Sequence, residues 1–334
     1  MRALILGGTG FVGRHVGEAL VAAGHSVTLL HRGRSNPGAL PDVEHVLGDR
    51  TALEPKSPLM ARTFDVVIDP SGYEVAVVRA AARAFGSRGA RYVFVSSVSV
   101  YEDLARMDEA FGPVRTTDDA ETAALTLANY GALKAACERA LDEELPGRVM
   151  HVRAGLILGP HDYDARFRYW LLRVARGGEV LAPGDPEAQT QAIDARDLAA
   201  FICRCVEARV VGTFNVTGAP MAMRARLETV RDVVASDARF VWAPDELLIA
   251  RDVKPYSEMP FWLPKSLGAL PVPIARAVSA GLSQRPFVET ARDTWAWLRQ
   301  GWDAEESVRA NRRFHIPAGL SDERERGILE SMKV

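Results

Sequence analysis

The stretch Ala3-Leu4-Ile5-Leu6-Gly7-Gly8-Thr9-Gly10-Phe11-Val12-Gly13 joins an apolar run to a glycine-rich turn and then to an amphipathic segment. The apolar run predicts a buried strand, and the apolar residues from Phe11 to Ala23 recur at helical spacing. Gly24 follows at the point where a helix commonly ends. The chain is therefore expected to begin with a strand, a tight turn and a helix.

Apolar runs alternate with helical patterns through the first two-thirds of the chain. Strands are expected at residues 27–30, 43–47, 66–68, 92–95 and 149–152, and helices at 75–86 and 120–145. Strands that are apolar throughout, with helices between them, indicate a parallel sheet covered on both faces. The sequence therefore predicts an α/β fold, a Rossmann-type doubly wound parallel sheet.

The pattern loosens after about residue 155. Helices are expected near residues 165–177, 196–208 and 287–300, with a short strand at 213–216, and prolines and tryptophans cluster from Pro244 onward. We predict a nucleotide-binding domain over residues 1–155, with later returns to the sheet near 190–218. Residues 156–334 are expected to form a smaller, partly helical substrate-binding lobe. This boundary is soft, because the strand at 213–216 can belong to the main sheet.

The composition of the 334-residue chain is that of an ordinary globular protein, with 48% hydrophobic and 25% charged residues. A formal net charge of −2 provides no general attraction to nucleic acids or anionic membranes. The longest run without charged residues, 210–223, has 14 residues. A membrane span would need roughly 18.

The start of the chain shows no signal-peptide pattern. The three cysteines, Cys137, Cys203 and Cys205, cannot all pair with one another and show no metal-ligand spacing. A reduced cytoplasmic setting is therefore favoured, and no metal site is expected. The expected partner is a small-molecule substrate, with neither nucleic acid nor membrane.

The turn from Gly7 to Gly13 follows a strand and opens a helix, which is the context that a phosphate-binding turn requires. Glycines let the backbone approach a pyrophosphate, and the helix N-terminus supplies free amide groups and a favourable dipole. The alternative is a tight turn that binds no ligand. The turn residues expected to contact a dinucleotide are Gly7, Thr9, Gly10, Phe11, Val12 and Gly13.

The end of the second strand distinguishes NAD from NADP. An acid there would hold the adenosine ribose, whereas an arginine would accept a 2′-phosphate. The segment Leu30-His31-Arg32-Gly33-Arg34-Ser35-Asn36 contains no acid, and the first one follows at Asp42. Arg32, Arg34 and Ser35 suit a phosphate, so NADP is expected and NAD is less favoured. The alternative is a solvated basic loop.

Other strand ends are expected to complete the cofactor site. Asp49 is expected to end the third strand facing the adenine, and Asp69-Pro70-Ser71-Gly72 to end the fourth strand near the pyrophosphate. Asp69 is equally well explained as a turn or capping residue. The remaining cofactor contacts are expected from Arg50, Ser71, Gly72, Ser96, Ala154 and Gly155.

Tyr130 and Lys134 lie four residues apart in a helical stretch and so project from the same face. Ser97 closes the fifth strand, at the carboxyl edge where open parallel sheets bind ligands. A free phenol titrates near 10 and acts near neutrality only beside a cation, which Lys134 supplies. Ser97 would donate a hydrogen bond to the substrate oxygen. These three residues are the predicted catalytic group, and Tyr130 and Lys134 are also expected to contact the cofactor.

The glycine turn, Ser97 with Tyr101 four residues later, and Tyr130-Gly131-Ala132-Leu133-Lys134 together resemble the extended short-chain dehydrogenase/reductases, the NAD(P)-dependent epimerase/dehydratase family. The resemblance runs from residue 1 to about 220 and includes Val152-Arg153-Ala154-Gly155 and Asp194-Ala195-Arg196-Asp197-Leu198. Residues 31–36 further resemble a bacterial branch near the chloroplast stem-loop RNA-binding proteins and the isoflavone-reductase-like enzymes.

The resemblance implies Tyr130 as the catalytic acid/base, Lys134 as the lysine that binds the ribose and tunes the tyrosine pKa, and Ser97 as the serine that polarises the carbonyl. It also implies a homodimer formed through the helix that carries Tyr130. One departure is Ala154, where the family usually has a proline. The backbone near the nicotinamide is therefore expected to differ.

Candidate substrate contacts lie after the fifth and sixth strands and in the proline-rich segment. They are Ser99, Tyr101, His161, Arg166 and Trp262. The aromatic and basic residues near Arg166 suit a polar aromatic or phosphorylated substrate, or else a packed helix with solvated arginines. The segment around Trp262 suits a lid over the site, or equally a set of packed loop side chains.

The sequence thus favours an NADP(H)-dependent oxidoreductase that reduces a carbonyl, or oxidises the matching alcohol, of a small organic substrate. The enzyme alternative is a sugar-nucleotide epimerase or dehydratase with bound NAD(P). The residue after Ser97 is Val98, so no carboxylate stands there to assist dehydration. The non-catalytic alternative is a nucleotide-sensing or RNA-binding protein that has kept the fold.

Overall fold

The computed structural model describes residues 1–334 apart from 35, 37, 53–57, 163–164, 301–318 and 334. The described chain forms two compact units. Unit 1 comprises Met1–Ile157, Ala195–Thr217 and Val272–Gln284, and unit 2 comprises Leu158–Asp194, Gly218–Pro271 and Arg285–Val334. Residues 272–284 were expected in the second lobe, whereas the structure places them in unit 1.

Unit 1 is built on a seven-stranded sheet in which every strand is parallel to its neighbours. In spatial order the strands are β11 (Gly212–Val216), β6 (Val149–Ala154), β5 (Arg91–Ser97), β4 (Val66–Asp69), β1 (Arg2–Leu6), β2 (Ser26–His31) and β3 (Glu44–Leu47). The predicted doubly wound parallel sheet is confirmed. The chain leaves β1 toward β2 on one side and later returns to β4 on the other, and ligands bind at such a reversal.

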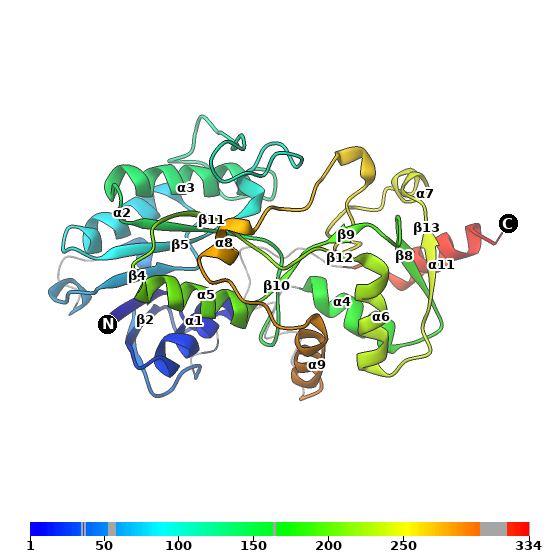
Figure 1. Ribbon diagram of the computed structural model, residues 1–334, viewed down its shortest axis with the longest axis horizontal. Helices are drawn as coiled ribbons and strands as arrows, with labels where there is room; N and C mark the ends of the chain where they lie inside the picture. Colours follow the sequence, from blue (N-terminus) through cyan, green and yellow to red (C-terminus); the bar gives the residue numbers. More distant parts are fainter. Residues whose placement is uncertain (35, 37, 53–57, 163–164, 301–318, 334) are drawn as a thin grey trace. The chain divides into compact units, whose positions relative to one another are not determined.

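Helices cover both faces of this sheet (Figure 1). The helix α1 (Phe11–Ala22) packs against α5 (Ala195–Glu207), and α2 (Val75–Gly86) packs against α3 (Tyr130–Glu144). A shorter helix, α8 (Ala275–Ser279), lies against β11. Three 3-10 turns complete the unit: η1 (Arg50–Ala52), η2 (Pro58–Ala61) and η3 (Val98–Val100).

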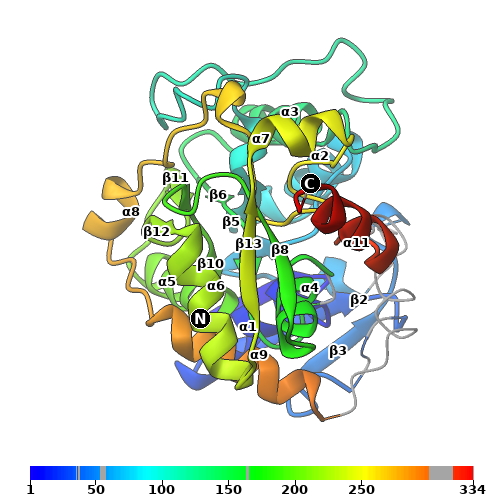
Figure 2. The same ribbon diagram turned by 90° about the vertical axis from the view of Figure 1, so that its right-hand side faces the viewer.

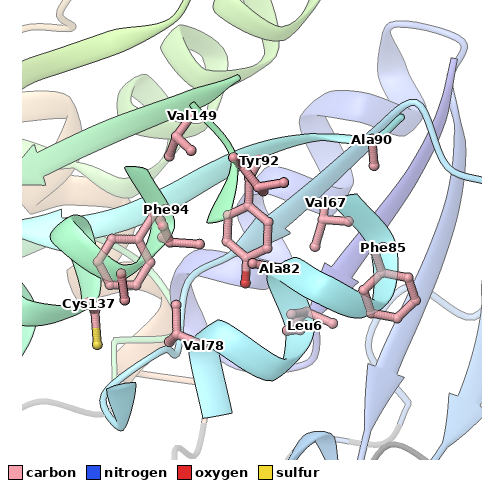
Figure 3. Close-up of a cluster of buried hydrophobic side chains, with 14 of the residues drawn as sticks. Leu6, Val67, Val78, Ala82, Phe85, Ala90, Tyr92, Phe94, Cys137 and Val149 are labelled. Carbon is pink, nitrogen blue, oxygen red and sulfur yellow. The ribbon is translucent and has the colours of Figure 1, made fainter. Parts of the chain in front are cut away.

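The core of unit 1 lies between β5, β4 and the pair α2 and α3. Figure 3 shows the rings of Tyr92 and Phe94, on β5, among side chains of α2 and the Cys137 side chain of α3. Both rings are almost fully buried, as is Cys137. A sheet face of largely apolar side chains and a helix face of alanines and valines explain this close packing.

One helix begins later than predicted. The sequence predicted a helix over residues 120–145, but α3 begins at Tyr130. Thr126 and Asn129 exchange two hydrogen bonds, from each backbone amide to the other side chain, at 2.7 and 3.2 Å. Threonine and asparagine side chains can take hydrogen bonds that the backbone would otherwise make within a helix. Here they hold residues 126–129 in a loop conformation. Tyr130 is consequently the first residue of its helix.

Unit 2 contains a two-stranded parallel ribbon flanked by helices. Figure 2 shows β8 (Glu179–Pro183) beside β13 (Arg239–Ala243), with α11 (Asp322–Ser331) next to β8. The other helices are α4 (Ala165–Ala175), α6 (Met223–Val234), α7 (Asp245–Ala250) and α9 (Phe287–Leu298), with the turn η4 (Lys265–Leu267). Short strands are β7 (Ile157–Leu158), β9 (Gln189–Thr190), β10 (Ile193–Asp194) and β12 (Met221–Ala222). Of these elements, only α4 and α9 were predicted from the sequence.

A buried ion pair joins α11 to α4. The Nε atom of Arg173 donates to a carboxylate oxygen of Glu325 at 2.5 Å, and the other oxygen of Glu325 accepts from the amide of Leu181 at 2.9 Å. In the part of the chain that the structure describes, every helix is too short or too polar to cross a membrane.

Candidate functional site

The glycine turn has the backbone geometry that a phosphate-binding turn requires. Gly7 has a φ of +93°, a conformation that favours glycine. Gly10 is the N-cap of α1 and offers no side chain to the first amide groups of the helix. The side chain of Thr9 is buried. The turn therefore presents backbone amides at the positive end of the helix dipole, which fits a pyrophosphate.

The turn also depends on close backbone packing. A Cβ atom on Gly13 would lie 2.8 Å from the carbonyl oxygen of Gly7 and 2.9 Å from the Cα atom of Gly8. A Cβ atom on Gly8 would meet the side chain of Leu29, on β2, at 2.4 Å. The helix is thus seated directly on the turn, with no room for side chains between them.

The exposed arginines Arg32 and Arg34 follow β2. One guanidinium nitrogen of Arg32 lies 3.9 Å from a carboxylate oxygen of Asp49. Asp49 lies beyond the end of β3, where it accepts hydrogen bonds from the amide and hydroxyl of Thr51. Ser35, the third residue expected at this loop, lies outside the described residues. The two arginines and Asp49 thus gather at one end of β2 and β3.

Arg50 is held in a buried ion pair. Its two terminal nitrogens each donate to one carboxylate oxygen of Asp69 at 2.5 Å, and Asp69 has no exposed surface. Asp69 also accepts from the hydroxyl of Tyr92 at 2.8 Å and from the amide of Ser71 at 3.1 Å. Arg50 was predicted to contact the cofactor directly, but its guanidinium is instead used to neutralise Asp69.

The segment after β4 is tightly packed. The Ser71 hydroxyl donates to the carbonyl oxygen of Leu6 at 2.9 Å and so ties the end of β4 to the end of β1. A Cβ atom on Gly72 would lie 2.7–2.8 Å from Asp69, Val78 and Phe94. Only glycine fits there, and its carbonyl oxygen is turned toward α3.

Lys134 projects from α3 into this edge of the sheet. Its Nζ atom donates to the carbonyl oxygens of Gly72 and Val95 at 2.8 and 2.7 Å. The side chain is 2% exposed, and this burial lowers the pKa of Lys134 to about 8. The Nζ atom also lies 4.6 Å from the ring centre of Tyr73 and 4.4 Å from that of Phe94.

The start of α3 at Tyr130 lies against η3, the 3-10 turn that follows Ser97. A Cβ atom on Gly131 would fall 2.0 Å from the carbonyl oxygen of Ser99, so the first turn of α3 touches η3 directly. The ring centres of Tyr130 and Tyr73 are 6.2 Å apart. The Ser97 hydroxyl oxygen is the cap of η3 and accepts from the Ser99 amide at 3.1 Å. The three predicted catalytic residues therefore share one edge of unit 1.

Other predicted contacts in unit 1 lie at the ends of β5 and β6. The Ser96 hydroxyl is buried and has no hydrogen-bond partner among the described residues. Gly155 follows Ala154 and donates its amide to Val216 at 3.0 Å. A Cβ atom on Gly155 would lie 2.3 Å from the Thr217 hydroxyl, so a side chain is excluded there too.

The two residues that follow Ser97 on the predicted substrate side have different surroundings. Ser99 is exposed. Tyr101 is fully buried, and its hydroxyl donates to the Asn215 side chain at 2.9 Å. Its ring centre lies 4.8 Å from the guanidinium carbon of Arg153. Tyr101 was predicted to touch the substrate, but the structure makes it part of the packing of unit 1.

Three predicted substrate residues belong to unit 2. The ring of His161, whose φ is +67°, lies 5.4 Å from that of Trp297, and the Arg166 guanidinium lies 5.6 Å from the Tyr256 ring. Trp262 is 4% exposed, and its Nε1 atom donates to Asp245 at 2.8 Å. Trp262 is therefore a packed side chain of unit 2, which agrees with the interpretation of this segment as packed loop side chains.

Two parts of the site were not predicted from the sequence. Tyr73 follows the segment that was predicted to approach the pyrophosphate, but no spacing rule connects it to Lys134. The Arg50–Asp69 pair joins residues 19 apart in sequence. Asp69 gave a signal, since it is an acid at the end of an apolar strand, but its partner could come from any neighbouring loop.

A group with metal-ligating side chains lies away from this edge. Ligand atoms of His25, Cys203 and Glu207 are within 4.8 Å of one another. His25 precedes β2, so the group lies at the amino end of that strand. The His25 ring and Glu207 are hydrogen-bonded at 3.1 Å, and the Cys203 thiol contacts the carbonyl oxygen of Ala19 at 3.8 Å. These contacts give the three side chains a structural role, in which they connect α5 to α1 and to the residue that precedes β2.

The Gly13→Ala substitution is expected to weaken dinucleotide binding at least tenfold. The new methyl group would overlap the backbone of Gly7 and Gly8, so the turn must move away from the geometry that fits a pyrophosphate. Binding is measured by thermal-shift titration with NADP+ and with NAD+. Gly327→Ala, on α11 with open space around it, is the matched control and should leave binding unchanged. Wild-type affinity in the Gly13 variant would remove the turn from the site.

The Asp69→Asn substitution is expected to lower the free energy of unfolding by about 3–5 kcal/mol at pH 7, because it leaves the buried Arg50 cation without its partner. Burial alone would raise the pKa of Asp69, but the Arg50 guanidinium outweighs it and holds that pKa below the ordinary value. The contribution is therefore full above about pH 5 and is lost as the pH falls through the depressed pKa of the folded protein.

Urea unfolding of both proteins between pH 3 and pH 8 measures this difference. The gap between wild type and variant should be constant above about pH 5 and shrink below pH 4. Glu187→Gln, which breaks an exposed pair with Arg224, should cost less than about 1 kcal/mol at any pH. A gap of that small size for Asp69→Asn would contradict the role of the buried pair.

Comparison with known proteins agrees with this geometry. The sequence model of the NAD dependent epimerase/dehydratase family matches residues 3–217. The 2'-dehydrokanamycin reductase of Streptomyces kanamyceticus is 32% identical over 260 residues, which cover 74% of this chain and 70% of that protein. The chloroplast stem-loop binding protein of 41 kDa b of Arabidopsis thaliana is 37% identical over 112 residues, or 29% of each chain.

Solved structures share the fold at low sequence identity. The UDP-N-acetylglucosamine 4-epimerase of Methanobrevibacter ruminantium superposes with a TM-score of 0.68 at 18% identity, over 90% of this chain and 99% of that one. The UDP-glucose 4-epimerase of Thermus thermophilus, solved with NAD, gives 0.65 at 19% identity, over 90% and 100%. The sheet, the glycine turn and the matched residues lead to one conclusion: this chain belongs to the NAD dependent epimerase/dehydratase family.

Proposed function

We propose that the chain is an NADP(H)-dependent reductase that converts a carbonyl of a small organic substrate to an alcohol, or catalyses the reverse oxidation. The observation that carries this proposal is the buried Lys134 ammonium, one helical turn from Tyr130 and hydrogen-bonded to the carbonyl oxygen of Val95, two residues before Ser97. A cation placed there favours the phenolate of Tyr130, so the phenol can release its proton near neutral pH.

The residues of unit 1 would divide the work as follows. The backbone amides from Gly7 to Gly13 would hold the pyrophosphate, and the bound NADPH supplies the hydride. The Tyr130 hydroxyl donates its proton to the substrate oxygen in the reductive direction. The Ser97 oxygen already accepts a hydrogen bond from the Ser99 amide, so its own proton is left to donate to the same substrate oxygen.

The preference for NADP is proposed from the basic end of β2. Arg32 and Arg34 are exposed there, and the described part of the loop places no acid at the strand end. A guanidinium binds a phosphate in a bidentate manner, which suits the 2′-phosphate. Asp49 lies 3.9 Å from Arg32 and would orient that side chain.

Reduction is favoured over epimerisation by the reductase relative, whose match covers 74% of this chain. That relative is named as a reductase of 2'-dehydrokanamycin. The likeness to epimerases supports the fold alone, since the identities are below 20%. A sugar-nucleotide epimerase or dehydratase with tightly bound NAD(P) is the second candidate. The name of the matching family, NAD dependent epimerase/dehydratase, supports this second candidate.

A thermal-shift titration with NADP+, NAD+ and a short RNA tests the cofactor. A ligand that binds only the folded protein adds about 2.7 kcal/mol of stability at a hundredfold excess over Kd. NADP+ is expected to raise the Tm more than NAD+ does. The double variant Arg32→Ala/Arg34→Ala should reduce the NADP+ shift to the size of the NAD+ shift, and Arg2→Ala, at the exposed start of β1, should not.

A larger shift with NAD+ would contradict the 2′-phosphate argument and favour the epimerase candidate. A shift with RNA alone would favour a non-catalytic protein of the same fold, as the name of the Arabidopsis relative suggests. Carbonyl compounds are then screened with the preferred reduced nucleotide.

The Tyr130→Phe substitution is expected to lower kcat at least a hundredfold, because the variant has no proton to donate at the substrate oxygen. The Tm shift with NADP+ should stay close to that of the wild type. Tyr169→Phe, in unit 2, should retain turnover and serves as the matched control. Equal activity in the Tyr130 variant would remove this residue from the reaction.

A further inference from the structure

The Lys134 ammonium has an unusual set of neighbours. An ammonium carries three N–H donors, and two of them are used by the carbonyl oxygens of Gly72 and Val95. The faces of two aromatic rings, Tyr73 and Phe94, lie 4.6 and 4.4 Å from the nitrogen. These distances are within the range in which a ring face attracts a cation.

No carboxylate of the described chain takes a hydrogen bond from Lys134. Among the carboxylates, Asp69 has the largest electrostatic effect on Lys134. Arg50 already neutralises Asp69 through two hydrogen bonds of 2.5 Å. Glu138, on the same helix, is paired with Arg153 at 2.7 Å. Cys137 is a neutral thiol, because burial raises its pKa to about 12. The charged and titratable groups that act on Lys134 are therefore Cys137, Asp69, Arg50 and Glu138.

The two rings differ in their place in the fold. Phe94 is a fully buried residue of β5 and belongs to the core of unit 1. Tyr73 is half-buried and lies in the loop between β4 and α2, directly after the glycine that leaves no room for a side chain. Its ring also lies 6.2 Å from that of Tyr130. Tyr73 thus covers the ammonium on the side where the predicted proton donor lies.

We propose that Tyr73 is a positioning residue for Lys134: its ring and that of Phe94 form an aromatic clamp that keeps the buried lysine in its charged form beside Tyr130. The clamp supplies what a carboxylate would supply elsewhere, without the negative charge that would cancel the effect of the lysine on the phenol. Only the catalytic consequence of this inference rests on the proposed function.

The test measures the titration of Lys134 itself. The chain contains five lysines, at positions 56, 134, 254, 265 and 333. Protein labelled with ¹³C at the lysine Cε is titrated by NMR, and Lys134→Met identifies the resonance. The wild-type Lys134 midpoint should lie near pH 8, since burial lowers its pKa to about 8. Tyr73→Leu should lower the midpoint further, by about half to one and a half pH units.

Tyr73→Phe keeps the ring and is the matched control, so its midpoint should equal that of the wild type. Phe94→Leu removes the other ring and should also lower the Lys134 midpoint. This variant tests the aromatic clamp independently if Tyr73→Leu does not fold. Thermal melting establishes that each titrated variant is folded. An unchanged or raised Lys134 midpoint in a folded clamp variant would overturn the proposal.

Turnover provides the second readout. In the reductive direction, the basic limb of the pH profile of kcat/KM should move to lower pH in Tyr73→Leu and return in Tyr73→Phe, and a purely structural defect would not move the limb. If no carbonyl substrate is reduced by the wild type, the proposed function fails. The NMR titration still decides whether Tyr73 controls the charge of Lys134.

Discussion

The buried carboxylate of Asp69 is the charge around which the carboxyl edge of unit 1 is arranged. It binds both terminal nitrogens of Arg50, the hydroxyl of Tyr92 and the amide of Ser71. Burial of an uncompensated charge is costly, so these four donors are a condition for placing an acid at the end of an otherwise apolar strand. With Asp69 neutralised by Arg50, Lys134 must be stabilised by carbonyl oxygens and ring faces instead. The carbonyl oxygens come from the ends of β4 and β5, and so the lysine is positioned by the backbone of the sheet.

A steric constraint accompanies this electrostatic one. At Gly13, Gly72 and Gly131 the chain approaches its neighbours so closely that a Cβ atom would fall within 3 Å of another atom. Each of these contacts joins a helix or a loop to a segment at, or directly after, the carboxyl end of a strand. The glycine positions therefore determine how near the phosphate turn, the loop after β4 and the start of α3 come to one another. The same closeness brings Tyr130 to the end of β5.

The sheet could be predicted from the sequence because its strands are short, apolar and separated by regular helices. The glycine turn and the pair Tyr130 and Lys134 could be found because each has a local spacing. The start of α3, the pairing of Arg50 with Asp69 and the burial of Tyr101 depend on contacts between distant residues, and no local pattern reports them. The β8 and β13 ribbon was missed for a related reason, since its two parallel strands pair across 55 residues of intervening sequence. The roles of the predicted site residues stay predictions.

The charge state of Lys134 connects the architecture of this edge to the direction of the proposed reaction. Reduction of a carbonyl consumes a proton, which the phenol of Tyr130 would supply, with the charged Lys134 assisting its release. Oxidation of an alcohol requires the phenolate instead. Because burial lowers the pKa of Lys134 to about 8, the positive charge beside Tyr130 is lost as the pH rises above that value. A clamp that keeps the lysine charged therefore extends to higher pH the range over which the lysine can assist proton release from Tyr130. An acid bonded to the same lysine would also keep it charged, but its negative charge would raise the pKa of the phenol, and so aromatic rings suit this position better than a carboxylate.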